Sequence, residues 1–205
     1  MIFDFSDKIN QHGLKVIFSN TEESNILKKA IVSMSQTHST NIEVVNNKKL
    51  VYSNVDGIFA CNKNYALQVK TADCLPIFFI HKHENIFGVI HAGWKGLKNG
   101  IITKSTKLLS SHIDLNEITA FIGPSISQKN YEVKNEFIDY FGNKFIDKVE
   151  NKFFCNLKGV ARSQLQKRGI KNVIDCNQCT YENKNYHSYR RNKTSKRMIG
   201  LIYYE

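Results

Sequence analysis

Two apolar runs joined by one short polar segment constrain the fold of this chain more than any other feature of its 205 residues. LPIFFI (residues 75–80) and IFGVI (86–90) flank the polar segment HKHEN. Short apolar runs of this kind are typical of buried strands, and a short polar turn between them predicts an antiparallel hairpin. TADC precedes the first run and HAGWKG follows the second, so reactive side chains stand at the edge of this hairpin.

The remaining pattern mixes strands with a few helices. Further strands are predicted over residues 15–18, 58–61, 65–69, 118–122, 173–175 and 198–204. Helical spacing predicts three helices. The first begins just past Gly96 and extends to Leu109, the second covers 135–141, and the third covers 157–168 and ends before Gly169. These elements lack a regular βαβ alternation, which predicts an α+β fold. We expect a single domain over residues 1–205, with mixed β-sheets and flanking helices.

The formal net charge of +11 raises the question of an acidic partner. It comes from 24 lysines and only 5 arginines, spread along the whole chain and locally dense only near 189–197. A nucleic-acid-binding face usually gathers arginine and aromatic side chains on one element. We therefore expect neither nucleic acid nor a membrane as a partner, and the sequence leaves the oligomeric state open.

The cysteines and the first residues bear on the compartment. Five cysteines is an odd number, and MIFDFSDKIN carries acids and lacks the pattern of a secretion signal. No apolar stretch reaches the ~18 residues that a membrane helix needs. We expect a cytoplasmic protein with reduced thiols.

Three side chains are candidate metal ligands: His38, Cys74 and His91. Two imidazoles and a thiolate suit zinc, and three protein ligands leave a fourth position open for water or substrate. Their spacing is not diagnostic, because an isolated cysteine or histidine is more often a core residue. The neighbouring Asp73 has three readings: a hydrogen-bond acceptor behind a ligand, a general acid or base, or a turn cap.

Two other motifs have both a functional and a structural reading. Gly93, Lys95 and Gly96 stand between a strand and a helix, where backbone N–H groups bind anions, although the same residues also make an ordinary tight turn. The pair Cys176 and Cys179 has the spacing of a zinc or redox motif, but one such pair is a weak signal. Cys61 and Cys155 lie in apolar runs and are predicted to be core residues.

Several motifs together resemble one family. TADCLPI, GVIHAGWKGL, IGPSIS followed by YEV, and CT followed by HSYRR are similar to the YfiH-like laccase-domain family, described both as multicopper polyphenol oxidases and as purine nucleoside phosphorylases. The resemblance extends from Ser35 to Tyr203. It implies a YfiH-like architecture, related to the CNF-toxin-like cysteine hydrolases, and a zinc site at His38, Cys74 and His91.

The resemblance also implies an activity. Family members are reported to cleave adenosine, inosine and methylthioadenosine with phosphate and to deaminate adenosine. The expected catalytic residues are Cys74, His91 and Asp73, and Lys95, Arg190 and Arg191 are candidates for holding phosphate, from charge and placement. Two alternatives stay open: an amidase that edits peptidoglycan precursors through a Cys74–His91 dyad or a metal, and a copper-dependent polyphenol oxidase, for which the histidines are few.

The chain departs from the family pattern at two places. The family carries a Phe-Ser/Thr-Arg segment followed by two glycines, where this chain has Phe18 to Ser24 without the arginine or the glycines. Near the C-terminus the family's Thr-Gly-Arg is Ser195, Lys196 and Arg197 here. We expect a shortened or divergent N-terminal segment with an intact metal site, and the departures leave two outcomes open: a changed choice of substrate or a loss of turnover.

Overall fold

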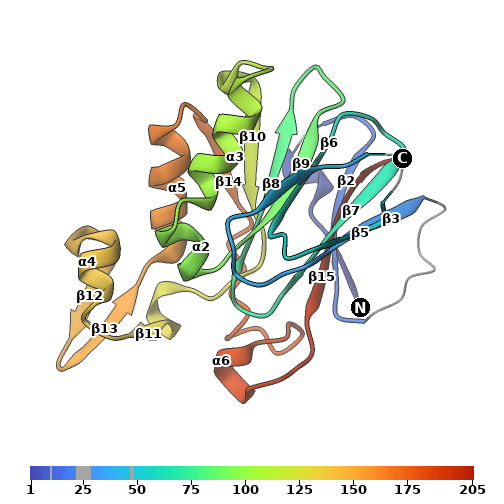
Figure 1. Cartoon of the computed structure of the whole chain (residues 1–205). Coiled ribbons are helices and arrows are strands. Elements are labelled where there is room, and N and C mark those ends of the chain that lie inside the picture. Colours follow the sequence, from blue (N-terminus) through green and yellow to red (C-terminus); the bar gives the residue numbers. More distant parts are fainter. Residues whose placement is uncertain (10, 22–28, 47–48) are drawn as a thin grey trace.

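The chain folds into two facing β-sheets, with helices over the outer face of the second one (Figure 1). The computed structural model describes residues 1–205 except 10, 22–28 and 47–48. In the first six-stranded sheet, β3 pairs in parallel with β5 and β7, and the other neighbours are antiparallel. Its strands, in spatial order, are β1 (Ile2–Asp4), β2 (Leu14–Ser19), β15 (Met198–Tyr204), β7 (Tyr65–Thr71), β3 (Ala30–Ser35) and β5 (Val51–Ser53).

The second six-stranded sheet contains the predicted hairpin. Its outer strands pair in parallel with their neighbours, and the four inner strands are antiparallel. In spatial order the strands are β14 (Asn172–Asp175), β10 (Ile118–Ile122), β8 (Leu75–His81), β9 (Phe87–Ala92), β6 (Gly57–Ala60) and β4 (Ile42–Val44). Mixed pairing in both sheets and the absence of regular βαβ units make this the α+β fold that the sequence predicts.

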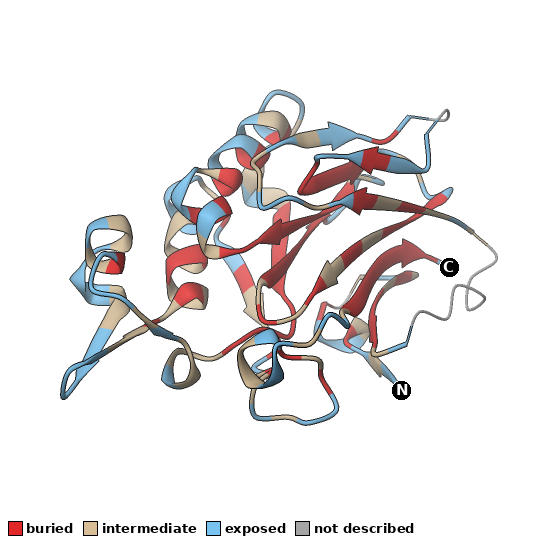
Figure 2. Cartoon of the chain, turned by 60° about the horizontal axis from the view of Figure 1, so that its bottom comes forward, coloured by how far each residue is buried: buried red, intermediate tan, exposed pale blue. Residues whose placement is uncertain are grey.

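Strand β8 shows why the hairpin sequence is apolar without alternation. Phe78 and Ile80 point into a core between the two sheets, whereas Ile77 and Phe79 point into a second core beneath the helices. All seven residues of β8 are buried because both faces of its sheet are covered. Each buried Leu, Ile or Phe side chain of this strand contributes about 2 kcal/mol of hydrophobic stabilisation. Figure 2 shows the buried segments running along the strands and the exposed ones on the outer sides of the helices.

Helices from the middle of the chain cover the second sheet, and a small third sheet extends to one side (Figure 1). The helices are α1 (Ser6–Ile9), α2 (Trp94–Lys98), α3 (Ile101–Ser110), α4 (Phe137–Phe141), α5 (Leu157–Lys167) and α6 (Tyr189–Asn192), with 3-10 turns at Leu115–Glu117, Gln128–Asn130 and Asn143–Phe145. The third sheet has the order β11 (Glu132–Val133), β13 (Lys152–Cys155), β12 (Ile146–Val149). Within the residues that the structure describes, no helix has the length and hydrophobicity needed to cross a bilayer.

The predicted strands and the helix over 157–168 are confirmed to within two residues, and the hairpin of β8 and β9 is antiparallel. The prediction of one helix beyond Gly96 was wrong. Helix α2 begins earlier, at Trp94, and includes Gly96; Gly100 then adopts φ +88° and separates α2 from α3. The apolar spacing continues across this break because both helices cover the same core.

The sequence did not predict the short strands. Strands β1, β4, β5, β11, β12 and β13 have two to four residues, and β3 alternates apolar residues with serines. Few apolar side chains in so short a span give no distinct period. Cys155 is buried as expected, but the prediction for Cys61 was wrong, because β6 ends at Ala60 and Cys61 is exposed in the following turn.

Candidate active site

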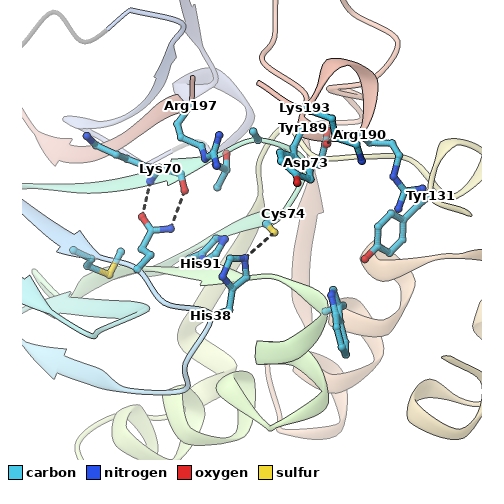
Figure 3. Close-up of a pocket in the computed structure, with 15 residues that line it drawn as sticks. His38, Lys70, Asp73, Cys74, His91, Tyr131, Tyr189, Arg190, Lys193 and Arg197 are labelled. Carbon is cyan, nitrogen blue, oxygen red and sulfur yellow. Dashed lines mark hydrogen bonds between the residues drawn. The ribbon is translucent and has the colours of Figure 1, made fainter. Parts of the chain in front are cut away.

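The three candidate ligands come together at one end of the hairpin (Figure 3). His38 lies in the loop after β3, Cys74 directly precedes β8, and His91 lies near the end of β9. One ligand atom from each side chain lies within 4.8 Å of the other two. The Cys74 Sγ is 3.9 Å from the His38 Nε2, and the two imidazole rings have centroids 4.8 Å apart. The structure therefore brings together residues from three separate parts of the sequence.

Strand register and one glycine explain the convergence. Pro76 pairs with His91 and Leu75 with Ala92, so Cys74 lies at the end of β8 that is next to His91. A Cβ at Gly93 would lie 3.0 Å from the Cys74 Sγ and 3.0 Å from the His38 Cδ2. Contacts that short require a shift of the neighbouring side chains. Glycine at position 93 thus allows the ligands to approach one another.

A buried carboxylate, Asp56, holds both histidines. Its side chain is 0% exposed, and the His91 Nδ1 donates a hydrogen bond of 2.8 Å to the Asp56 Oδ1. The same carboxylate accepts hydrogen bonds from the backbone N–H groups of Thr37, His38 and Ser39. These bonds fix the loop in which His38 has φ 59°. A ligand histidine that donates its second N–H to a carboxylate is held in one tautomer and orientation, which leaves the His91 Nε2 for a metal.

The electrostatics of the site favour ionised forms. Burial raises the pKa of Asp56, but hydrogen bonds from His91, from Ser39 and from backbone N–H groups lower it to about 2 overall. Burial also raises the pKa of Cys74, whereas the charge of His91 and hydrogen bonds with both histidines lower it to about 6. Burial lowers the pKa of His91, and the Cys74 thiolate and the Asp56 hydrogen bond raise it to about 9. Without a metal, Cys74 and His91 therefore form a thiolate–imidazolium pair.

The residues fit a metal by their donor chemistry. Two imidazole nitrogens and a thiolate sulfur are a set that zinc binds, and the buried carboxylate behind His91 is a typical supporting group. His38 is exposed and Cys74 is half-buried, so the site is open on one side. An open side is what separates a catalytic metal site from a closed structural one.

The open side faces a cavity of about 540 Å³. Its lining combines the candidate ligands with cations and aromatic rings: Met34, Gln36, His38, Lys70, Thr71, Ala72, Asp73, Cys74, His91, Trp94, Tyr131, Tyr189, Arg190, Lys193 and Arg197. Four of these side chains are cations and one is a carboxylate, so the cavity favours anions. Burial raises the pKa of Tyr131, which keeps its phenol neutral. The volume and lining are those of a small-molecule site.

Comparison with known proteins identifies the family. The sequence profile of the multi-copper polyphenol oxidoreductase laccase family matches residues 16–205. The chain belongs to this family. A curated relative, purine nucleoside phosphorylase Cj1217c of Campylobacter jejuni, is 33% identical over 202 residues, which cover 97% of this chain and 86% of the relative. A purine nucleoside phosphorylase of Aquifex aeolicus is 37% identical over 147 residues, covering 72% and 69% of the two chains.

Solved structures place this family member in the same fold as the YfiH proteins. The YfiH protein of Bacillus licheniformis superposes with a TM-score of 0.83 at 25% identity, covering 91% of this chain and 79% of that one. A Neisseria meningitidis protein gives a TM-score of 0.84 at 22% identity, covering 95% of each chain, and this likeness concerns the fold alone. The predicted YfiH-like α+β architecture is thereby confirmed.

The copper centres that the family's description names do not fit this member of the laccase family. In the described part of the chain, His38, Cys74 and His91 are the one group of three or more His, Cys, Asp or Glu residues close enough to share a metal. His81 uses its Nδ1 to accept backbone N–H groups, and the His83 Nε2 lies 3.5 Å from Glu117. A multicopper oxidase needs several clustered histidines, which the described residues do not supply.

Asp73 lines the cavity, and its two carboxylate oxygens are bonded to the C-terminal segment rather than to a candidate ligand. It adopts φ +88° and is 8% exposed, and it faces the C-terminal segment. Its Oδ1 accepts from the Thr180 hydroxyl at 2.6 Å, and its Oδ2 accepts from the Arg190 backbone N–H at 2.6 Å. Asp73 thus anchors the segment that carries Arg190, and Asp56 is the carboxylate that supports a ligand.

The three phosphate-binding candidates separate in space. Arg190 lines the cavity, with its guanidinium 5.0 Å from the centre of the Tyr131 ring. Lys95 is exposed on α2 and is not among the residues that line the cavity. The Arg191 guanidinium donates to the carbonyls of Thr180, Tyr181 and Tyr186, which closes the turn that precedes α6. Of the three, Arg190 is therefore the cation placed to contact a ligand in this cavity.

The divergent N-terminal segment is only partly described. Residues 22–24, which include two of its acids, lie outside the described residues. Asn20 stands where the family has arginine, and its side chain bonds to the N-terminal amine and to the Asn185 carbonyl, away from the cavity lining. At the other departure, Arg197 does line the cavity.

The paired cysteines lie apart from the ligand set. Cys176 is buried in the core between the sheets, and burial raises its pKa to about 11. Cys179 accepts a hydrogen bond from the Ser127 N–H and donates one to the Ser127 hydroxyl. Neither lines the cavity or joins a group of metal ligands among the described residues.

Sequence reasoning missed Asp56 and Tyr131 as site residues. Asp56 stands between Val55 and Gly57, directly before the apolar strand β6. An acid placed among apolar residues is expected to be buried, and a buried carboxylate needs a partner. This position in the sequence was the signal that could have identified Asp56. Tyr131 lies within the recognised YEV motif, but nothing in the local sequence indicates that its ring borders the cavity.

Proposed function

We propose that this protein is a zinc-dependent purine nucleoside phosphorylase. It would cleave adenosine, inosine and methylthioadenosine with inorganic phosphate, giving the free base and a ribose 1-phosphate. The observation that carries the proposal is one cavity in which an open His/His/Cys set faces an arginine and aromatic rings. The names of the Campylobacter and Aquifex relatives support the same reaction class.

The proposed roles follow from the lining of the cavity. The Trp94, Tyr131 and Tyr189 rings offer apolar surfaces to a purine, and Arg190 offers a forked donor to phosphate. A phosphate oxygen forms a bond to C1′ of the ribose while the bond from C1′ to the purine nitrogen breaks, and its electron pair leaves with the base, which then takes up a proton. Orienting these two reactants is the main task of the protein groups.

His38, Cys74 and His91 would hold the zinc, with Asp56 orienting His91. When bound, zinc would supply Lewis acidity and a water of lowered pKa, the chemistry that nucleoside deaminases use. We therefore include adenosine deamination as a proposed side activity of the same site.

The test is chromatography of inosine and adenosine incubated with metal-quantified protein, with and without inorganic phosphate. Phosphate-dependent release of hypoxanthine or adenine is the expected result, and inosine formed from adenosine without phosphate would report deamination. The Cys74→Ala variant serves as the matched blank for contaminating enzymes. One zinc per chain with both nucleosides unchanged would reject the proposal.

One observation favours a second candidate function, an amidase that uses a Cys74–His91 dyad. The pKa of Cys74 near 6 and that of His91 near 9 describe an activated thiolate beside its acid when no metal is bound. A cysteine amidase would be inactivated by stoichiometric alkylation of Cys74 in protein isolated with its native metal content. A zinc-bound thiolate would resist the same reagent, so iodoacetamide labelling followed by mass spectrometry separates the two functions.

A further inference from the structure

Two arginines of the C-terminal segment line the cavity, and within the described part of the chain no carboxylate pairs with either guanidinium. Arg190 donates its Nη1 to the Glu132 carbonyl, and Arg197 donates its Nη1 to the carbonyls of Thr194 and Lys196. Among the described residues, neither guanidinium takes part in an ion pair, and no hydrogen bond engages its Nε or Nη2. Both side chains are half-buried, so each keeps a forked donor edge for a ligand.

These two arginines lie on opposite sides of the candidate ligands. Figure 3 shows Arg197 on the side of Lys70, and Arg190 on the other side, next to Tyr131, with Cys74 and Asp73 between them. Asp73, the carboxylate of the lining, has both oxygens engaged by Thr180 and the Arg190 backbone. The cavity therefore has two separate positive regions, where a single inorganic phosphate needs only one.

In the proposed reaction, two positive regions could bind two separate phosphoryl groups. Phosphate attacks C1′ of a nucleoside from the face opposite the base, whereas the 5′ carbon projects from the same face as the base. A phosphoryl group at the 5′ position and the attacking phosphate therefore lie on opposite sides of the ribose ring. Arginine forks match the oxygens of phosphoryl groups in a bidentate manner, and half-buried arginines are the better ligands because their charge is less screened.

We propose that Arg197 forms a second phosphoryl subsite and that the preferred substrates are purine nucleoside 5′-monophosphates. This inference rests on the proposed phosphorylase function. Inorganic phosphate, held at Arg190, would form the bond to C1′ while the bond from C1′ to the purine breaks with its electron pair. The products would be the protonated free base and ribose 1,5-bisphosphate, with no other co-reactant.

The kinetic test compares inosine with inosine 5′-monophosphate as substrates at saturating inorganic phosphate. Wild-type protein is expected to show a kcat/KM at least about tenfold higher for the monophosphate, a typical gain from one charge-assisted pair. In Arg197→Gln the ratio of the two kcat/KM values is expected to fall to about one. Lys196→Gln, which removes a neighbouring exposed cation outside the cavity lining, should keep the wild-type ratio. Equal kcat/KM values in the wild type, or an unchanged ratio in Arg197→Gln, would overturn the inference.

Equilibrium binding separates this inference from the proposed function. Titration calorimetry of zinc-loaded protein with each compound, without phosphate, needs no turnover. Tighter binding of inosine 5′-monophosphate than of inosine, lost in Arg197→Gln and partly kept in Arg197→Lys, would support the subsite even if no base is released. Loss of the phosphorylase with this binding pattern intact would reject the function alone, whereas equal affinities for the two compounds would reject the subsite. Circular dichroism of each variant establishes that it is folded.

Discussion

Asp56 and Asp73 are both buried, and each supports one wall of the cavity. Asp56 supports the metal wall, formed by His38, Cys74 and His91, and Asp73 supports the arginine wall, formed by Arg190 and Arg197. Asp56 lies directly before β6, is 0% exposed, and uses its carboxylate on a ligand imidazole and three backbone N–H groups. Asp73 binds one hydroxyl and one N–H of the C-terminal segment, more than 100 residues away in sequence. The metal wall is thus built on β8, β9 and a loop that Asp56 fixes, whereas the arginine wall belongs to the segment between β14 and β15, which includes α6 and is fastened at a few points.

This difference assigns separate functions to the two walls. A group built on strands keeps its geometry because displacing it would disrupt sheet packing, and such groups suit a reaction centre that requires fixed positions. A fastened loop is the part of a site where changes alter substrate affinity without dismantling the fold. Substitutions in the metal wall should therefore affect metal binding and turnover together, and substitutions in the arginine wall should affect substrate affinity.

The largest effect is expected for Cys74→Ala, which removes a ligand from the metal wall. Zinc content should fall to background, and phosphorolysis should fall by ~10³-fold, the scale of losing a principal electrostatic stabiliser. Cys61→Ala, the same change at an exposed turn, is the control and should alter neither quantity. Elemental analysis and chromatography of inosine measure both. Full zinc content with full turnover in Cys74→Ala would refute the assignment of the ligand set.

The two aspartates themselves provide the next comparison. Asp56→Asn keeps an oxygen but removes the charge that His91 contacts, so zinc affinity should fall by about 10- to 100-fold. Asp73→Asn makes the same chemical change at the other wall and should leave zinc affinity at the wild-type value. Competition with a chromophoric chelator gives both constants. Equal losses in the two variants would show that the walls are not independent.

Acid should also act on the metal wall of the metal-free protein. The pKa of Asp56 is lowered from 3.8 to about 2, so the folded state binds this proton less readily than the unfolded state. Its stabilisation is present in full above pH ~5 and is lost as the pH falls through 3.8 towards 2, by ~2 kcal/mol. Urea unfolding between pH 5 and pH 2.5 measures the loss. Asp56→Asn should lose less free energy of unfolding over this range, and parallel curves for the two proteins would contradict the prediction.

The sequence predicted more of the residues of the metal wall than of the arginine wall. His38, Cys74 and His91 belong to recognisable motifs, and the apolar hairpin that positions two of them has a strong local signal. Asp56 was missed because its importance depends on burial and on a partner 35 residues away. Lys95 and Arg191 were candidates by charge alone, and charge does not reveal direction: one side chain points to solvent and the other caps carbonyl groups. Contacts between distant segments decide such cases.

A smaller effect is expected from Thr180→Val in the arginine wall. Valine keeps the shape of the side chain but removes the hydroxyl that donates to Asp73, and the Asp73 Oδ1 is left unsatisfied. The less firmly held segment should raise the KM for phosphate by about fivefold, corresponding to ~1 kcal/mol, with zinc content unchanged. Thr103→Val, on the exposed face of α3, is the matched control. A loss of zinc, or a change in kcat without a change in KM, would contradict the role given to this wall.

The smallest functional effect is expected from Cys176→Ala, which tests whether a cysteine outside both walls contributes to the site. Cys176 is 1% exposed within the core between the sheets, and its raised pKa keeps the thiol protonated, which makes it a poor metal ligand. The small cavity left by the missing sulfur should lower the free energy of unfolding by about 1 kcal/mol. Zinc content and the kcat/KM for inosine should match the wild type, in contrast to the same substitution at Cys74. A loss of zinc in Cys176→Ala with the fold intact would extend the metal wall beyond β8 and β9, because β14, which Cys176 follows, lies at the edge of the same sheet.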